Sequence, residues 1–401
     1  MSSSTGIGGG GTGGDGGQAC VPACAGRECG PDGCGGLCGA CSDGTCDAEG
    51  LCCPDTWALR VPAIVRHLAT SPEGSRLYVG DEAGDVRSLR TCDGKVAPNT
   101  ASLVETMSTR IAAVRQTTGL VHAVGTGNGA IKVHTLDPKT LAIVGAPVEV
   151  ASTSGKNVFG VELDQAGRLW LGVHEDGGLV VRVAPGKPPC TMDLDASPTL
   201  TMGLASTPSS LVLALLSPFN STTTVRRYPW SGIDAEACSF TASASDDAAL
   251  GTVVNGMASE GERVFVAQLG GNPSGNVAAI LSRHDPGGAD VSVTLDVTPT
   301  LDGFMSVAAT PQAVYVGGVA GGLYTRDFSI ASGEAWVWRY DSAFDGASSP
   351  KSSTEVPGGR VAMALTVGAS GVYVAGQSSD GAGFVVKCTT ALACPTVPGP
   401  N

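Results

Sequence analysis

One strand pattern recurs seven times along this 401-residue chain, and it limits the possible folds more than any other feature. The copies begin 46, 47, 43, 53, 50 and 57 residues apart. They read VRHLA from Val65, IAAVR from Ile111, VFGVE from Val158, TMGLA from Thr201, VNGMA from Val254, FMSVA from Phe304 and VAMAL from Val361. A four-stranded blade takes about 40–50 residues. The sequence therefore predicts an all-β fold, a seven-bladed β-propeller over residues 57–401.

Two further regularities support this register. The third position of the strand is small in most copies, as innermost strands crowded around an axis require. A second strand follows, in forms such as LYVG, LWLG and VYVA, with an aromatic at its second position. The aromatics are Tyr78, Trp170, Phe265, Tyr315 and Tyr373, and we place His122 and Leu213 at this position in the second and fourth blades.

The segments RLYVGDEAGDV and GVYVAGQSSDG, from Arg76 and Gly371, have a characteristic strand-turn pattern. With them, residues from about Trp57 to the C-terminus resemble bacterial seven-bladed propellers related to WD-repeat and Tyr-Val-Thr-Asn-repeat proteins. The Thr-Asn half of the latter motif is missing, and no Gly-His or Trp-Asp pair stands at the WD-repeat positions. Such propellers have many unrelated functions, so the resemblance implies the fold and not an activity.

The ring closes only if the two ends of the chain share one blade, because an open ring leaves strand edges unpaired. TWALRV, at Thr56–Val61, is one candidate for the outer strand of the last blade. LACPTV, at Leu392–Val397, is the other, and we expect a Cys388–Cys394 disulfide to favour it.

Two segments of different composition precede the propeller. Residues 1–19 are rich in Gly and Ser and predict a flexible tether. Residues 20–56 contain nine cysteines and no aromatic residue, so this module needs covalent cross-links in place of a hydrophobic core. The run CGPDGCGGLCGAC is similar to cysteine-rich segments near the N-termini of myxobacterial surface lipoproteins, which implies a cellular location and no ligand.

We expect all fourteen cysteines to form disulfides: Cys20, Cys24, Cys29, Cys34, Cys38, Cys41, Cys46, Cys52, Cys53, Cys92, Cys190, Cys238, Cys388 and Cys394. Because nine is odd, one module cysteine needs a partner elsewhere, and a bond from Cys52 or Cys53 to Cys92 is the prediction. A zinc site at Cys38 and Cys41 is the alternative. No His precedes His67 and the surroundings are acidic, so we favour disulfides.

Disulfides imply an oxidising compartment, and we expect a bacterial outer-membrane lipoprotein or a secreted protein. The chain starts without a signal peptide. Met1 in this interpretation replaces a lipidated cysteine, or else the start is misplaced. The net charge of −13 without a basic stripe argues against nucleic acid and against anionic lipid. Membrane attachment is expected only through a lost lipid anchor.

Enlarged connections between second and third strands mark a candidate ligand face. LSPFNSTTT in the fourth blade and GVAGGLYTRDFSIASGEAW in the sixth combine aromatic and polar groups, which suits a glycan, peptide or protein ligand. The predicted ligand-binding residues are Phe219, Asn220, Tyr324, Arg326 and Phe328. The favoured function is a non-catalytic binding or scaffold propeller, with no catalytic residue, bound metal or cofactor. Tolerated insertions would produce the same loops without function.

The alternative function is a metal-dependent hydrolase or lactonase. It requires oxygen ligands that converge at the axis, because a hard cation such as calcium takes several of them. Only Glu162 and Asn255 on the inner strands qualify, with His67 in a matching register. Ordinary channel-lining side chains would explain the same three residues.

Overall fold

The protein is described from a computed structural model. It describes residues 22–400 except 43, 47–49, 104–109, 118, 128–129, 151–156, 165, 175–178, 185–186, 195–199, 218–221, 235–236, 241–244, 251–252, 272–276, 289, 296–300 and 323–331. The chain divides into two compact units, Met1–Pro54 and Asp55–Asn401.

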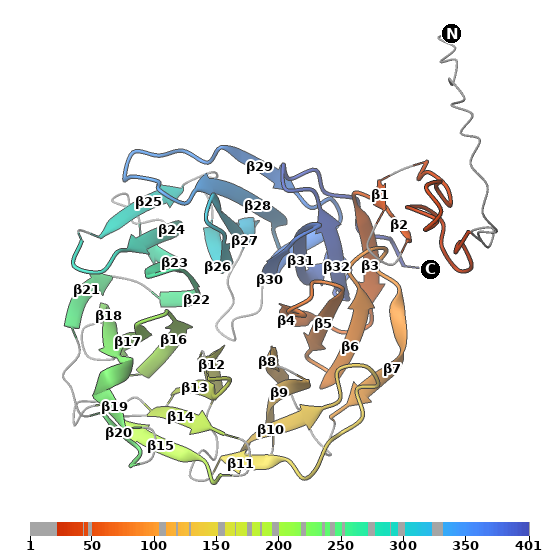
Figure 1. Cartoon of the computed structure of the whole chain (residues 1–401). Helices are drawn as coiled ribbons and strands as arrows, with labels where there is room; N and C mark the ends of the chain where they lie inside the picture. The colour runs from red at the N-terminus through yellow and green to blue at the C-terminus, as the bar shows by residue number, and fades with distance from the viewer. Residues whose placement is uncertain are drawn as a thin grey trace, which may run out of the picture. The chain divides into compact units, whose positions relative to one another are not determined.

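Within the described residues, the second unit contains seven four-stranded antiparallel sheets arranged as blades around one axis, which confirms the all-β seven-bladed propeller (Figure 1). From the axis outward, blade 1 is β4 (Val65–Thr70), β5 (Arg76–Asp81), β6 (Asp85–Arg90) and β7 (Val96–Ser102). Blade 2 is β8 (Arg110–Thr117), β9 (Leu120–Gly127), β10 (Ala130–Leu136) and β11 (Val148–Val150). Blade 3 is β12 (Asn157–Leu163), β13 (Leu169–His174), β14 (Leu179–Val183) and β15 (Cys190–Asp193).

Blade 4 is β16 (Leu200–Ser206), β17 (Ser210–Ser217), β18 (Thr222–Pro229) and β21 (Ser245–Leu250). Blade 5 is β22 (Val253–Glu260), β23 (Arg263–Gly271), β24 (Val277–His284) and β25 (Val291–Leu295). Blade 6 is β26 (Leu301–Ala309), β27 (Ala313–Gly322), β28 (Glu334–Asp341) and β29 (Ser352–Glu355). Blade 7 is β30 (Gly359–Gly368), β31 (Gly371–Ser378), β32 (Gly383–Cys388) and β3 (Trp57–Val61).

The ring is closed by β3, which pairs with β32 from Trp57 opposite Lys387 to Val61 opposite Gly383. Cys388 and Cys394 are disulfide-bonded, yet Leu392–Val397 forms no strand. The expectation that this disulfide favours the C-terminal segment as the closing strand is therefore wrong. The segment is used in packing instead, since Leu392 and Val397 are buried in the hydrophobic core around Val356.

A β-bulge interrupts every inner strand just before the third position of its copy, which is His67 in blade 1 and a small residue in the other six blades. The bulged residues are Arg66, Ala112, Phe159, Met202, Asn255, Met305 and Met363. This repeat corrects two assignments. The pattern of blade 7 starts at Ala362, one residue later than predicted, so its small residue is Ala364. The aromatic of a second strand pairs with the fifth residue of the inner-strand copy. In blade 4 the residue at this place is Val212 and not Leu213.

The third position of an inner strand is small because the inner strand of the next blade lies close to it. A Cβ on Gly160 would lie 2.7 Å from the backbone nitrogen of Leu204, which belongs to the inner strand of blade 4. A Cβ on Gly256 would lie 3.2 Å from the Cα of Ser306 in blade 6. Consecutive inner strands therefore approach so closely at these positions that side chains are excluded.

The recurring aromatics of the second strands connect each blade to the next. Three tyrosine hydroxyls donate to backbone carbonyls just after the third strand of the following blade: Tyr78 to Pro138 (3.1 Å), Tyr315 to Thr390 (3.2 Å) and Tyr373 to Thr91 (3.4 Å). The other aromatics meet rings in the equivalent segment, Trp170 with Trp230 and Phe265 with Phe344. Burial raises the pKa of Tyr78 to about 12. The aromatic repeat is thus an inter-blade contact.

We expect Tyr315→Phe to lower the free energy of unfolding by about 1 kcal/mol, because it removes one inter-blade hydrogen bond from a buried ring. Urea denaturation measures this loss. Tyr340→Phe is the control, since the Tyr340 ring is also buried and its hydroxyl bonds no group in the described part of the chain. Equal losses in both variants would contradict the role of the Tyr315 hydroxyl.

Disulfides hold both units. In the first unit Cys24 pairs with Cys38, Cys29 with Cys46 and Cys41 with Cys52, around a hairpin of β1 (Thr45–Cys46) and β2 (Cys52–Cys53). In the propeller, Cys190 of β15 is bonded to Cys238. Cys238 lies between β19 (Ile233–Asp234) and β20 (Ser239–Phe240), which follow the short 3₁₀ helix η1 (Trp230–Gly232). Among the described cysteines none is a free thiol, as expected in an oxidising, extracytoplasmic compartment.

Candidate functional site

All seven inner strands contribute to one cavity at the axis of the ring, with a volume of about 460 Å³. Its lining begins at the bulged positions, among them Arg66, Asn255 and Met305, and continues to Thr70 and Val367 beside the turns into the second strands. A β-bulge re-aims the side chain of its extra residue. The repeated bulge therefore presents a set of side chains to this cavity that plain alternation of the strand would not.

Three consecutive inner strands, β4, β8 and β12, contribute hydrogen-bonded side chains that we call the polar arc: His67, Arg115 and Glu162. Arg115 Nη1 lies 2.9 Å from His67 Nε2. Arg115 Nη2 donates to Glu162 Oε1 at 2.7 Å. The side chains of Arg115 and Glu162 are 22% and 25% exposed, so both remain accessible from the cavity.

The polar arc determines the tautomer and the charge of His67. A guanidinium has only donors, so Nε2 of His67 accepts and the proton of the neutral ring lies on Nδ1. Burial, with a smaller contribution from the positive charge of Arg115, lowers the pKa of His67 well below 6.5. His67 is therefore neutral at pH 7 and oriented by its arginine.

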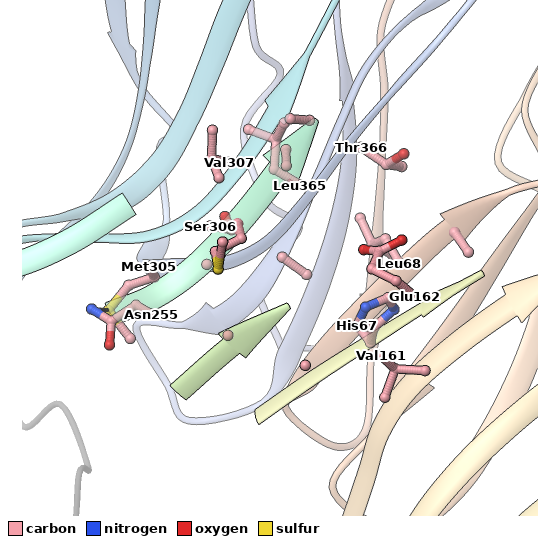
Figure 2. Close-up of a pocket in the computed structure, with 18 of the residues that line it drawn as sticks. His67, Leu68, Val161, Glu162, Asn255, Met305, Ser306, Val307, Leu365 and Thr366 are labelled. Atoms are coloured by element: carbon pink, nitrogen blue, oxygen red, sulfur yellow. Dashed lines mark hydrogen bonds between the residues drawn. The ribbon is translucent and has the colours of Figure 1, made fainter. Parts of the chain in front are cut away.

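The opposite wall is lined differently. Asn255 Nδ2 donates to the carbonyl oxygen of Phe304 at 2.8 Å and lies 3.7 Å from the sulfur of Met305. Ser306 is 9% exposed, and its hydroxyl has no hydrogen-bond partner among the described residues. Figure 2 shows Asn255 and Met305 on one side of the cavity and His67 with Glu162 on the other.

An aromatic side chain completes the lining. Phe159, the bulged residue of β12, is 43% exposed although it lines a cavity. It stands on the same strand as Glu162, three residues earlier. A large apolar side chain left accessible inside a concave site is typical of a ligand contact.

The structure brings together the three inner-strand residues singled out in the sequence, since His67, Glu162 and Asn255 line the same cavity. Sequence reasoning missed Arg115, which links two of them. The available signal was its register: Arg115 in IAAVR and Glu162 in VFGVE both stand at the fifth position of their copies. Oppositely charged residues at equivalent positions of adjacent blades indicate an ion pair.

The predicted loop site lies outside the described residues. Phe219 and Asn220 fall in the stretch 218–221, and Tyr324, Arg326 and Phe328 fall in 323–331. Their role in ligand binding stays a prediction.

The described residues fit neither of the two metal-site alternatives. Groups of His, Cys, Asp and Glu close enough to share an ion occur in the described part of the chain at Cys29, Cys41 and Cys52, and these three sulfurs are already in disulfides. Cys38 of the predicted zinc alternative is likewise bonded to Cys24. At the axis, Glu162 accepts from Arg115 and the amide nitrogen of Asn255 is held by a backbone carbonyl. The described residues therefore do not converge as oxygen ligands for a hard cation.

Comparison with known proteins adds no relative. No family model matches the chain, and no curated protein is similar to it at a significant level. In the described residues no helix combines the length and apolar character that crossing a bilayer requires.

Proposed function

We propose that this chain is a non-catalytic extracytoplasmic binding protein whose propeller receives a glycan, peptide or protein ligand at the axial cavity. Phe219, Asn220, Tyr324, Arg326 and Phe328 stay candidate contacts for a larger ligand, and residues 1–19 would serve as the protein's tether to a lipid anchor or an envelope partner. The observation that supports the proposal most directly is the exposed Phe159 beside the polar arc in one concave site.

The polar arc suits binding better than acid–base chemistry. A general base needs a free lone pair directed at the proton that it removes. Nε2 of His67 already accepts a hydrogen bond from a permanent cation, and the same cation engages one carboxylate oxygen of Glu162. Side chains locked to one another in this way offer a ligand fixed donors and acceptors, which is what a preorganised binding site requires.

We expect Phe159→Ala to weaken ligand binding at least about tenfold, equivalent to about 1.4 kcal/mol. The test probes glycan and peptide arrays with the full chain and then measures the dissociation constant of each positive ligand. Because Phe159 is 43% exposed, its truncation should leave the melting temperature nearly unchanged.

Ile143→Ala is the matched control. Ile143 is 51% exposed and does not line the cavity, so its truncation removes a comparable exposed apolar side chain at another place. Equal binding by both variants would exclude the axial cavity as the ligand site. An absence of any ligand on both arrays would contradict binding of a glycan or a peptide.

A further inference from the structure

The charged groups that the described residues contribute to the axial cavity cancel in pairs. Arg115 is paired with Glu162 at 2.7 Å, and Arg66, the other arginine of the lining, donates to Glu82 at 2.6 Å. His67 is neutral at pH 7. An anionic ligand at either arginine would meet the neighbouring carboxylate, and a cationic ligand would meet the guanidinium. The described lining therefore offers hydrogen bonds without a net charge for an ion to neutralise.

The charged side chains of the described lining occupy only one side of the ring. At the fifth position of the inner strands, blades 2 and 3 have Arg115 and Glu162, whereas blades 4, 5 and 6 have alanine: Ala205, Ala258 and Ala308. Across the cavity from the arc, Met305 and Val307 are part of the lining (Figure 2). Asn255 and Ser306 add polar atoms to that wall. A ligand that fits both walls therefore has hydrogen-bonding groups around its edge, most of them toward the arc, and apolar surface between them.

These properties are those of a neutral sugar ring. Its hydroxyls lie around the rim and both donate and accept, which matches the planar donors of Arg115 and the acceptor oxygens of Glu162. Its C–H faces are apolar and pack on aromatic rings, and Phe159 is exposed on the same strand as Glu162. The cavity of about 460 Å³ lies in the range that takes small-molecule ligands.

We propose that the axial cavity binds a neutral carbohydrate, as one or two sugar rings, with the polar arc on its hydroxyls and Phe159 against its C–H face. This inference rests on the proposed binding function and specifies its ligand class. It places recognition at the axis and assigns no part to the loop residues.

The test uses the full chain with methyl glycosides of glucose, galactose, mannose and N-acetylglucosamine as neutral probes, and with glucuronate and glucosamine as charged ones. Saturation-transfer NMR detects binding and titration gives the dissociation constants. We expect at least one neutral glycoside to bind, and its charged analogues to bind at least about tenfold more weakly. Glu162→Gln and Phe159→Ala should each weaken the neutral probe about tenfold or more, whereas Ile143→Ala should not change its affinity.

Melting temperatures show whether each variant is folded. If Glu162→Gln unfolds the protein, Phe159→Ala decides the question alone, because an exposed side chain contributes little to stability. Tighter binding of glucuronate or glucosamine than of every neutral glycoside would overturn the proposal, and so would a neutral-sugar affinity that Phe159→Ala leaves intact. Binding on the peptide array without any sugar binding would overturn the carbohydrate class and leave the binding function standing.

Discussion

Trp57→Ala should lower the free energy of unfolding by about 3–5 kcal/mol, the usual cost of removing a buried aromatic side chain. Trp57 is 8% exposed in β3. Its indole nitrogen donates to the carbonyl of Thr91 at 3.1 Å, and its ring centroid lies 6.0 Å from that of Tyr373. One side chain therefore joins the closing strand to blade 1 and to the second strand of blade 7.

Because of the position of Trp57 in the ring, its removal affects blades 7 and 1 together. β3 is the outer strand of blade 7 while the next residues of the chain lead into blade 1, so a weakened β3 loosens the junction at which the two ends of the propeller meet. Urea denaturation, monitored by far-ultraviolet circular dichroism and not by tryptophan fluorescence, measures the change in the free energy of unfolding. Trp57→Phe is the control, because it keeps a packed ring and loses only the hydrogen bond and part of the buried indole, so its loss should be smaller, about 1–2 kcal/mol. A loss below 1 kcal/mol for the alanine variant would show that β3 does not hold the ring closed.

Gly160→Ala should destabilise the propeller by about 1–3 kcal/mol, although it adds one methyl group. The new Cβ would lie 2.7 Å from the backbone nitrogen and 2.9 Å from the Cβ of Leu204. Neither atom is at the end of a flexible side chain, so the inner strand of blade 4 must shift as a whole. Because Gly160 lines the cavity between Phe159 and Glu162, we expect ligand affinity to fall as well.

Gly346→Ala is the matched control for this substitution. A Cβ on Gly346 would meet its nearest atom, the carbonyl oxygen of Ser292, at 3.5 Å, an ordinary contact. Melting temperatures of the two variants, measured side by side, separate the effect of crowding from the general effect of replacing glycine. A Gly160→Ala protein as stable as Gly346→Ala would mean that inner strands can separate freely.

The fold could be predicted because every blade packs on its neighbours in the same way and so needs the same types of residue at the same positions. Small residues such as Gly160 and aromatics such as Tyr315 recur wherever an inner strand meets its neighbour or a second strand reaches the next blade. The exact pairing register of the inner strands was harder to predict, because a bulge adds one residue to each of them. In blade 7 the apolar run around Met363 fits two registers equally well by composition, and only the pairing of Ala364 with Ala375 separates them.

The candidate site was predictable in part. Glu162 and Asn255 stand out as polar residues on strands that are otherwise apolar, and both line the cavity. Arg115 was missed because an arginine at the end of an apolar strand usually extends into solvent. Its role appears only when the ring places β8 between β4 and β12. The sequence also left the closing strand ambiguous, because Trp57–Val61 and Leu392–Val397 have similar apolar content. The composition of a segment does not indicate which distant strand it pairs with.

The closing strand has a mechanical consequence. β3 begins two residues after the start of the propeller unit at Asp55, so tension applied at Asp55 reaches the ring through this strand. A pull along β3 loads the ladder from Trp57–Lys387 to Val61–Gly383 in shear, with its hydrogen bonds strained together and not one after another. The strand that completes the ring is thus also the element that resists a force applied at the start of the propeller unit.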